Sequence, residues 1–137
     1  MGLILDTSVI VAVERQGLTP SQTFAQIALK SGNVPIAISV MTLLELLHGV
    51  ERARTERQAE RQLAFVDILS KELNPFPISA EIARLAGRIE GRLAARGIAV
   101  AVEDLLIGAT ALHLGFSVAS LNLKHFALIP DLTIIAL

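Results

Sequence analysis

The 137-residue sequence has no cysteine, tryptophan or tyrosine, and only five phenylalanines. The lack of cysteine excludes disulfide bridges and thiolate metal sites, and it fits a reducing cytoplasm. The scarcity of aromatic residues leaves few side chains on which nucleic-acid bases can stack. An excess of one charge is also missing, because 12 basic and 13 acidic residues give a net charge of −1. The overall charge therefore predicts no nucleic-acid binding.

Long apolar segments are missing as well, since Glu45 and the pair Glu103-Asp104 interrupt the longest apolar runs and no run spans a bilayer. The first residues lack the basic region and apolar stretch of a signal peptide. With 53% hydrophobic and 18% charged residues, the composition excludes disorder. We therefore expect a single domain, residues 1–137, in the cytoplasm and with no membrane association. The low charge and the many apolar residues also suggest that a partner covers part of its apolar surface.

Strand and helix patterns alternate along the chain. Short apolar runs predict strands, and segments with one apolar face and capping residues predict helices. The expected strands are 3–5, 36–39, 117–121 and, at an edge, 133–137, and the expected helices are 7–15, 20–31, 40–54, 56–73, 80–96 and 103–114. Such alternation predicts a three-layer α/β/α fold, with a parallel sheet of four or five strands flanked by helices.

Asp6 stands directly after the first apolar run, Leu3–Leu5, and before the first helix. A strand that is apolar throughout is typical of the interior of a parallel sheet, and open α/β sheets bind ligands at the carboxyl ends of such strands. The position therefore favours a functional carboxylate. The alternative is that Asp6 caps the helix that follows, whose first N–H groups need an acceptor.

Glu45 lies within a helix that is apolar almost all round. A carboxylate there is at least partly desolvated, so it must be protonated, paired with a cation or bound to a metal ion. Thr42 precedes it by one turn on the same face and offers a hydroxyl. The structural alternative is an ion pair between Glu45 and an arginine.

Asp104 opens a helix after an apolar loop, next to Glu103. On its own it reads equally well as a first-turn acid that faces the helix dipole. Together with Asp6 and Glu45, however, it is expected at the carboxyl edge of the sheet, where three carboxylates must share protons or a cation. Oxygen ligands without cysteine favour Mg²⁺ or Mn²⁺, and such ions serve phosphate chemistry.

Four motifs follow one another over nearly the whole chain: Leu3-Ile4-Leu5-Asp6-Thr7-Ser8, Ser39-x-x-Thr42-x-x-Glu45-Leu46-x-x-Gly49, Asp104-x-x-Ile107-Gly108-Ala109-x-Ala111 and Ser120-x-Asn122-x-x-His125-Phe126. Their order and spacing resemble those of the PIN-domain family, and of its VapC-type toxins in particular. The resemblance implies a PIN-like fold and a Mg²⁺- or Mn²⁺-dependent endoribonuclease. It also implies a homodimer that a small cognate antitoxin holds inactive.

Within this resemblance, Asp6, Glu45 and Asp104 are the expected metal ligands and catalytic residues, and Thr7, Thr42, Ser120 and Asn122 are the expected neighbours that orient carboxylates, water or substrate. The chain departs from the family at the fourth acidic position, where it has His125. Two consequences for the metal site are open: weaker metal binding, or a shift of the preference toward Mn²⁺. For His125 itself, the two alternatives are a contact with phosphate and a surface histidine with satisfied hydrogen bonds.

Basic residues suggest two places for contacts with RNA phosphates. Arg84, Arg88, Arg92 and Arg96 recur every four residues and form one stripe on a helix, and Lys124 stands within the fourth motif. Phosphate contacts supply most of the affinity for nucleic acids, so either place suits RNA. The alternative for the stripe is a solvated face.

The function predicted from the sequence is therefore cleavage of RNA phosphodiesters by metal-activated water, in the toxin of a toxin–antitoxin pair. The main alternative is a non-catalytic module of the same fold that binds protein or nucleic acid, because of His125. A phosphoacceptor domain of the receiver type also gathers acids at strand ends. It fits less well, because Asp6 follows the first strand and Glu45 lies inside a helix.

Overall fold

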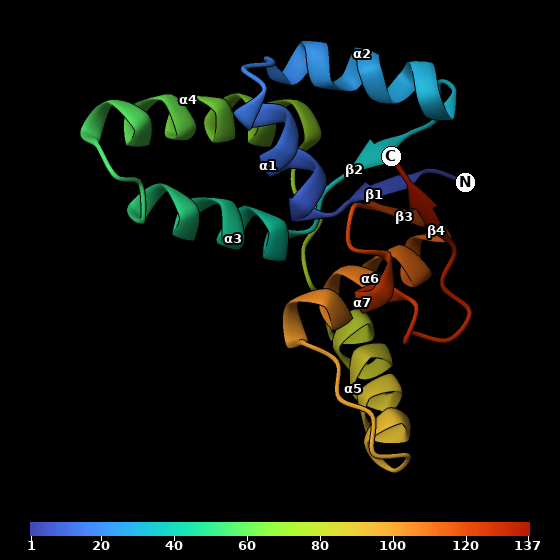
Figure 1. Cartoon of the computed structure of the whole chain (residues 1–137). Helices are drawn as coiled ribbons and strands as arrows, with labels where there is room; N and C mark the ends of the chain where they lie inside the picture. Colours follow the sequence, from blue (N-terminus) through green and yellow to red (C-terminus); the bar gives the residue numbers. More distant parts are fainter.

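A four-stranded parallel sheet forms the centre of the structure, a computed structural model that describes every residue from Met1 to Leu137 (Figure 1). Its strands are β1 (Leu3–Leu5), β2 (Ile36–Ala37), β3 (Ser117–Ser120) and β4 (Ile134–Ala136). The strand order is β2-β1-β3-β4, so β1 is central and β4 lies at an edge. In the register, Leu3 lies opposite Ile36 on one side and Ser117 on the other. The sheet agrees with the prediction of a parallel sheet with an edge strand at the end of the chain.

Seven helices connect and cover the strands: α1 (Thr7–Arg15), α2 (Pro20–Ser31), α3 (Val40–Glu51), α4 (Glu56–Leu73), α5 (Ala80–Ala94), α6 (Val102–Leu114) and α7 (Leu123–Phe126). Hydroxyl side chains begin four of them, at Thr19, Ser39, Thr55 and Ser79, where each accepts a hydrogen bond from a backbone N–H of the first turn. Such caps satisfy N–H groups that have no partner within the helix.

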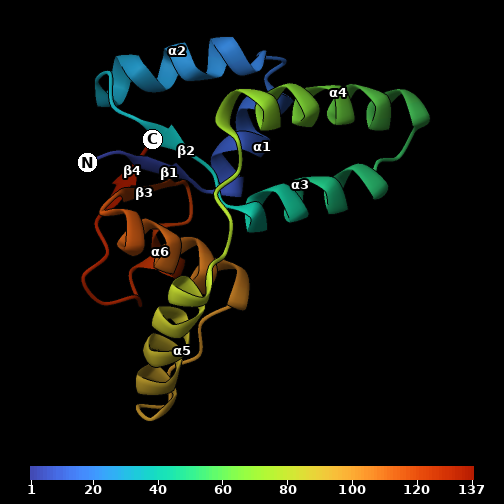
Figure 2. The ribbon, with the colours of Figure 1, turned by 180° about the vertical axis from the view of Figure 1, so that it is seen from behind.

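Alternation of side chains along the strands divides the core into two halves. Leu3 and Leu5 of β1 pack with α1, α2, α3 and α4, whereas Ile4 packs with α6 and α7 on the opposite face. Helix α5 lies outside α6 and packs on it through Ile82 and Ala86. Figures 1 and 2 show α1, α2 and α4 on one side of the sheet and α5 and α6 on the other. The three-layer α/β/α fold is therefore confirmed.

Some element bounds differ from the prediction. Strand β2 ends at Ala37 because the next residues bond to Phe76 instead of to the sheet: Phe76 N donates to Ile38 O at 2.7 Å, and Val40 N donates to Phe76 O at 3.0 Å. Helices α3 and α5 end three and two residues earlier than predicted, at Glu51 and Ala94. Helix α7, which contains His125, was not predicted, because four residues are too few to show a helical period.

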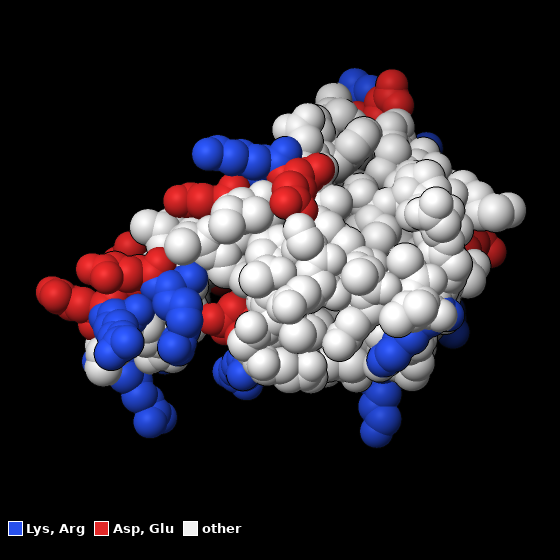
Figure 3. Space-filling view, turned by 90° about the horizontal axis from the view of Figure 1, so that it is seen from above, with Lys and Arg blue, Asp and Glu red and all other residues white.

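Apolar side chains are exposed on α3 and α4, in keeping with the expectation that a partner covers part of the apolar surface. Leu44 and Leu47 of α3 and Leu63 and Ile68 of α4 are exposed, whereas α1 exposes no large apolar side chain. Figure 3 shows charged side chains gathered at the end of the molecule where α3 and α4 meet, with a broad uncharged face beside them. None of the helices has the length and apolarity needed to cross a membrane.

Candidate active site

An open cleft of about 500 Å³ lies at the carboxyl edge of the sheet, between α1, α3, α6 and the chain that follows β3. The structure brings Asp6, Glu45 and Asp104 together on its walls, with Glu103 beside them. They come from three segments that are far apart in the sequence. The parallel topology explains this arrangement, because the segments that follow β1 and β2 and the one that leads into β3 all meet at this edge.

Asp6 is 5% exposed and is held by two hydroxyl groups. Ser8 Oγ donates to Asp6 Oδ2 at 2.7 Å, and Ser120 Oγ donates to the same oxygen at 2.8 Å. Although Asp6 occupies the N-cap position of α1, its side chain accepts no capping hydrogen bond. The carboxylate is therefore turned toward β3 and the cleft, and the capping alternative does not describe it.

Glu45 receives its hydroxyl from Thr7 and not from Thr42, which the helix spacing had suggested. Thr7 Oγ1 donates to Glu45 Oε1 at 2.7 Å, while Thr42 Oγ1 lies 3.4 Å from the Thr7 hydroxyl. No arginine or lysine lies within 4.0 Å of the Glu45 carboxylate, so the ion-pair alternative is wrong.

The pKa of Glu45 is raised, chiefly because burial disfavours its charged form. The hydrogen bond from Thr7 lowers this pKa, and the nearby charges of Asp6, Asp104 and Glu103 raise it. Glu45 is thus a partly desolvated acid within a group of like charges.

Asp104 makes its closest polar contact with the histidine of the fourth motif. His125 Nδ1 lies 3.2 Å from Asp104 Oδ2, with the imidazole 59% and the carboxylate 18% exposed. Burial raises the pKa of Asp104, His125 lowers it, and the charges of Asp6 and Glu103 raise it, which leaves the pKa above its ordinary value. His125 therefore lines the cleft beside Asp104, with most of its imidazole exposed.

The segment after β3 is held at both the start of α1 and the end of β3. Leu121 N donates to Ser8 Oγ of α1 at 3.1 Å, and Asn122 N donates to Ser120 Oγ of β3 at 2.8 Å. Asn122 lines the cleft, as predicted for a residue near the carboxylates. The contribution of Ser8 was not predicted from the sequence, although its place two residues after Asp6 is one from which a short hydroxyl side chain reaches back to a carboxylate.

The predicted phosphate-binding residues lie elsewhere. Arg84, Arg88 and Arg92 are exposed on α5, on the far side of α6, and none of them lines this cleft, nor does Lys124 on α7. The cation that does line it is Arg15, at the end of α1. A signal for it was present, because Ser8, Val11, Ala12 and Arg15 follow the i, i+3, i+4, i+7 spacing of one helix face, and all four line the cleft.

The donor set suits a hard divalent cation. Four carboxylates line the cleft, no arginine or lysine neutralises any of them within 4.0 Å, and two of them have raised pKa values because of burial and mutual repulsion. As the side chains stand, no three acidic or histidine residues are close enough together to form an assembled metal site. An ion such as Mg²⁺ keeps several waters and needs only one or two direct carboxylate ligands, so the cleft fits such an ion.

Comparison with known proteins agrees with this geometry. The family model of the PIN domain matches residues 3–132. The chain is 34% identical to Ribonuclease VapC1 of Rickettsia felis and 33% identical to Ribonuclease VapC of Rickettsia bellii, in each case over 98% of this chain and 96% of the relative.

Among solved structures, the crystal structure of VapBC2 from Rickettsia felis bound to a DNA fragment from their promoter contains a chain that matches with a TM-score of 0.82 and 26% identity. The match covers 100% of this chain and 99% of that one. The strand order, the four motifs and these similarities lead to one conclusion: the chain belongs to the PIN-domain family and to its VapC group.

Proposed function

We propose that this chain is a metal-dependent endoribonuclease and the toxin of a toxin–antitoxin pair. The observation that carries the proposal is the joining of Asp6, Glu45 and Asp104 in one cleft with no lysine or arginine paired to them. The VapC relatives are named ribonucleases, which supports RNA cleavage as the reaction. Their similarity extends over nearly the full length of both chains, so the whole catalytic domain is compared.

In this proposal Asp6, Glu45 and Asp104 hold a Mg²⁺ or Mn²⁺ ion, largely through water. When bound, the ion lowers the pKa of a water molecule and neutralises the negative charge that develops on the phosphodiester. The side chains of the protein keep the three carboxylates in place for this task. Ser8 and Ser120 orient Asp6, Thr7 orients Glu45, and His125 orients Asp104.

The remaining walls of the cleft suit a polar, anionic substrate. Asn122 offers an amide and Arg15 a guanidinium, and both line the cleft with the carboxylates. The apolar lining is small, consisting of Val11, Ala12 and Leu121. RNA is therefore recognised here through its backbone and polar groups more than by base stacking, in keeping with the scarcity of aromatic residues.

The partners proposed for the chain are a cognate antitoxin and a second copy of the chain, and its proposed location is the cytoplasm. The structural relatives that support an antitoxin are VapBC complexes. The exposed side chains Leu44, Leu47, Leu63 and Ile68 provide apolar surface for such contacts.

Incubation of the purified protein with RNA in Mg²⁺ or Mn²⁺, and in EDTA, tests the enzyme. We expect cleavage only with a divalent ion, and loss of cleavage in Asp6→Asn, Glu45→Gln and Asp104→Asn. Asp131→Asn is the matched control, because Asp131 is an exposed acid outside the cleft. Metal-independent cleavage, or full activity in the three cleft variants, would contradict the proposal.

A non-catalytic module of the same fold is the second candidate. The contact of His125 with Asp104 favours this candidate, because the imidazole occupies one oxygen of Asp104. His125 also stands at the position where the family has a fourth acid. Calorimetric titration of the protein with Mn²⁺ near neutral pH separates the two candidates. An absence of divalent binding, together with an absence of cleavage, would favour the module over the enzyme.

A further inference from the structure

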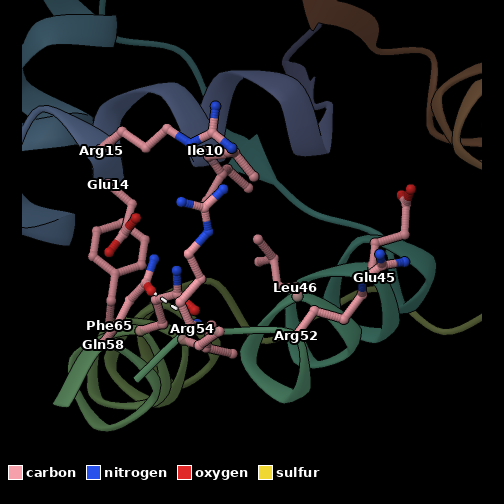
Figure 4. A pocket seen from close by; sticks show the side chains of 14 residues that line it. Ile10, Glu14, Arg15, Glu45, Leu46, Arg52, Arg54, Gln58 and Phe65 are labelled. Carbon is pink, nitrogen blue, oxygen red and sulfur yellow. Dashed lines mark hydrogen bonds between the residues drawn. The ribbon is translucent and has the colours of Figure 1, made fainter. Parts of the chain in front are cut away.

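A second groove, of about 360 Å³, opens beside the acidic cleft between α1, α3 and α4 (Figure 4). The two are continuous, because Val11, Arg15 and Glu45 line both of them. An extended molecule whose reacting bond lies in the acidic cleft therefore has a path along this groove.

Four of the six apolar residues that line the groove form a buried floor. Ile10, Leu46, Phe65 and Val66 are all at least nine-tenths buried and belong to the main core. The side chains that remain accessible around them are chiefly polar or charged, namely Glu14, Arg15, Arg52, Arg54 and Gln58. Val11 and Ala53 leave some apolar surface between these side chains, but the charged groups dominate what is accessible, so the groove favours a polar occupant.

Three of these accessible side chains are arginines without a carboxylate partner. The whole structure has two ion pairs with an N–O distance of 4.0 Å or less, and both involve histidine. Arg15, Arg52 and Arg54 are therefore unpaired, although Glu14 and Glu45 line the same groove. A guanidinium offers a planar fork of donors that matches a phosphate group.

The backbone that carries these arginines is well held. Arg52 and Ala53 donate backbone hydrogen bonds to Gly49 O and Val50 O, and Arg54 N donates to Gln58 Oε1 at 3.1 Å. Figure 4 shows Arg15 and Arg54 pointing toward one another from α1 and from the turn between α3 and α4. The two arginines are therefore attached to well-held backbone on opposite walls of the groove.

We propose that Arg15, Arg52 and Arg54 bind backbone phosphates of the RNA on one side of the bond that is cleaved. This inference rests on the proposed function, since it takes the acidic cleft as the place of cleavage. Arg15 is the arginine that lines both cavities, so it binds the phosphate nearest to the carboxylates. Arg52 and Arg54 bind phosphates farther along the groove.

Binding of a short fluorescein-labelled single-stranded RNA of mixed sequence, measured by anisotropy in EDTA over a series of salt concentrations, tests the proposal. The variant Arg15→Gln/Arg52→Gln/Arg54→Gln should bind more weakly. The slope of log Kobs against log salt should become shallower by roughly 0.7 for each phosphate that the variant no longer binds, or roughly 2 in all. The control variant Arg84→Gln/Arg88→Gln/Arg92→Gln makes the same change of charge on α5 and should keep the slope of the wild type.

Equal slopes for the groove variant and the wild type, or an equally weakened affinity in both triple variants, would overturn the proposal. The first result would favour a protein partner as the occupant of the groove. Melting temperatures verify folding, and they should stay at the wild-type value because the substituted side chains are exposed and unpaired. Because binding is read without a divalent ion, a failure of cleavage by the wild-type protein is a separate result that bears on the proposed function alone.

Discussion

Ser120 Oγ donates a hydrogen bond of 2.8 Å to Asp6 Oδ2 and so joins the ends of two neighbouring strands, β1 and β3, across 114 positions of the sequence. Ser120 is fully buried, and its oxygen also accepts the backbone N–H of Asn122. One hydroxyl therefore positions a carboxylate and the first residues after β3 together.

Replacement of Ser120 by alanine tests this link. Ser120→Ala leaves the Asn122 N–H without its partner and leaves Asp6 Oδ2 with the hydrogen bond from Ser8 alone, so we expect a loss of about 1–3 kcal/mol of unfolding free energy. RNA cleavage should fall as well, because Asp6 loses a group that orients it. Urea unfolding and a cleavage assay measure the two effects. Ser117→Ala on the same strand, whose side chain makes no hydrogen bond, is the control, and equal behaviour of the two variants would contradict the link.

Glu45→Gln separates a functional carboxylate from a structural one. The free protein holds Glu45 near the charges of Asp6 and Asp104, so removal of one charge should leave the metal-free protein as stable as the wild type or more stable. Divalent binding and RNA cleavage should be lost. The effects of Glu45→Gln, Asp6→Asn and Asp104→Asn on cleavage should not add, because the three residues serve one site. A Glu45→Gln protein that melts much lower yet still cleaves RNA would refute this view.

The raised pKa of Glu45 also predicts a pH dependence. The folded protein holds this proton more tightly than the unfolded chain does, so the contribution of Glu45 to stability is present below its ordinary pKa of 4.5 and is lost as the pH rises through the raised value. Glutamine cannot titrate. The melting temperature of metal-free Glu45→Gln should therefore gain on that of the wild type as the pH rises from 4.5 toward neutral. A difference that stays constant with pH, measured by calorimetry, would argue against the shift.

His125 offers a test of the fourth acidic position. His125→Asp adds a carboxylate beside Asp104, which should strengthen Mg²⁺ or Mn²⁺ binding and lower the melting temperature of the metal-free protein through repulsion. His125→Asn is the control, because asparagine has nearly the same shape as aspartate but no charge. Titration calorimetry in each divalent ion measures the change, and equal metal affinity of the Asp and Asn variants would show that position 125 takes no part in holding the ion.

Gly108 allows α6 to pack closely on the segment between α7 and β4. A Cβ atom at this position would lie 2.6 Å from Ile129 Cδ1 and 3.3 Å from Leu132 Cδ2. Gly108→Ala should therefore force the buried Ile129 side chain to shift, and the overpacking should outweigh the gain in helix propensity and destabilise the protein. Gly87 on α5 has open space around it, so Gly87→Ala should stabilise the protein by about 0.5–1 kcal/mol through helix propensity. Chemical denaturation of both variants checks the predicted opposite signs.

The sequence by itself determined the layers, the edge position of the last strand and the meeting of Asp6, Glu45 and Asp104. These features follow from local patterns, because an apolar strand followed by a helix can bury both faces only in a parallel sheet, and such a sheet collects its strand ends at one edge. The four motifs indicated the family for the same reason, since each is a short run of residues with a fixed spacing.

The tertiary structure alone decided which side chains complete the site. Helix spacing pointed to Thr42 as the partner of Glu45 and to the α5 stripe for phosphate binding, yet Thr7 bonds to Glu45 and Arg15 lines the cleft. The contact of His125 with Asp104 likewise joins residues from separate segments, and so do the hydrogen bonds of Phe76 with Ile38 and Val40, just after β2. Periodicity places a side chain on a face of its own helix or strand, but its partner depends on how whole elements pack, which no local pattern contains.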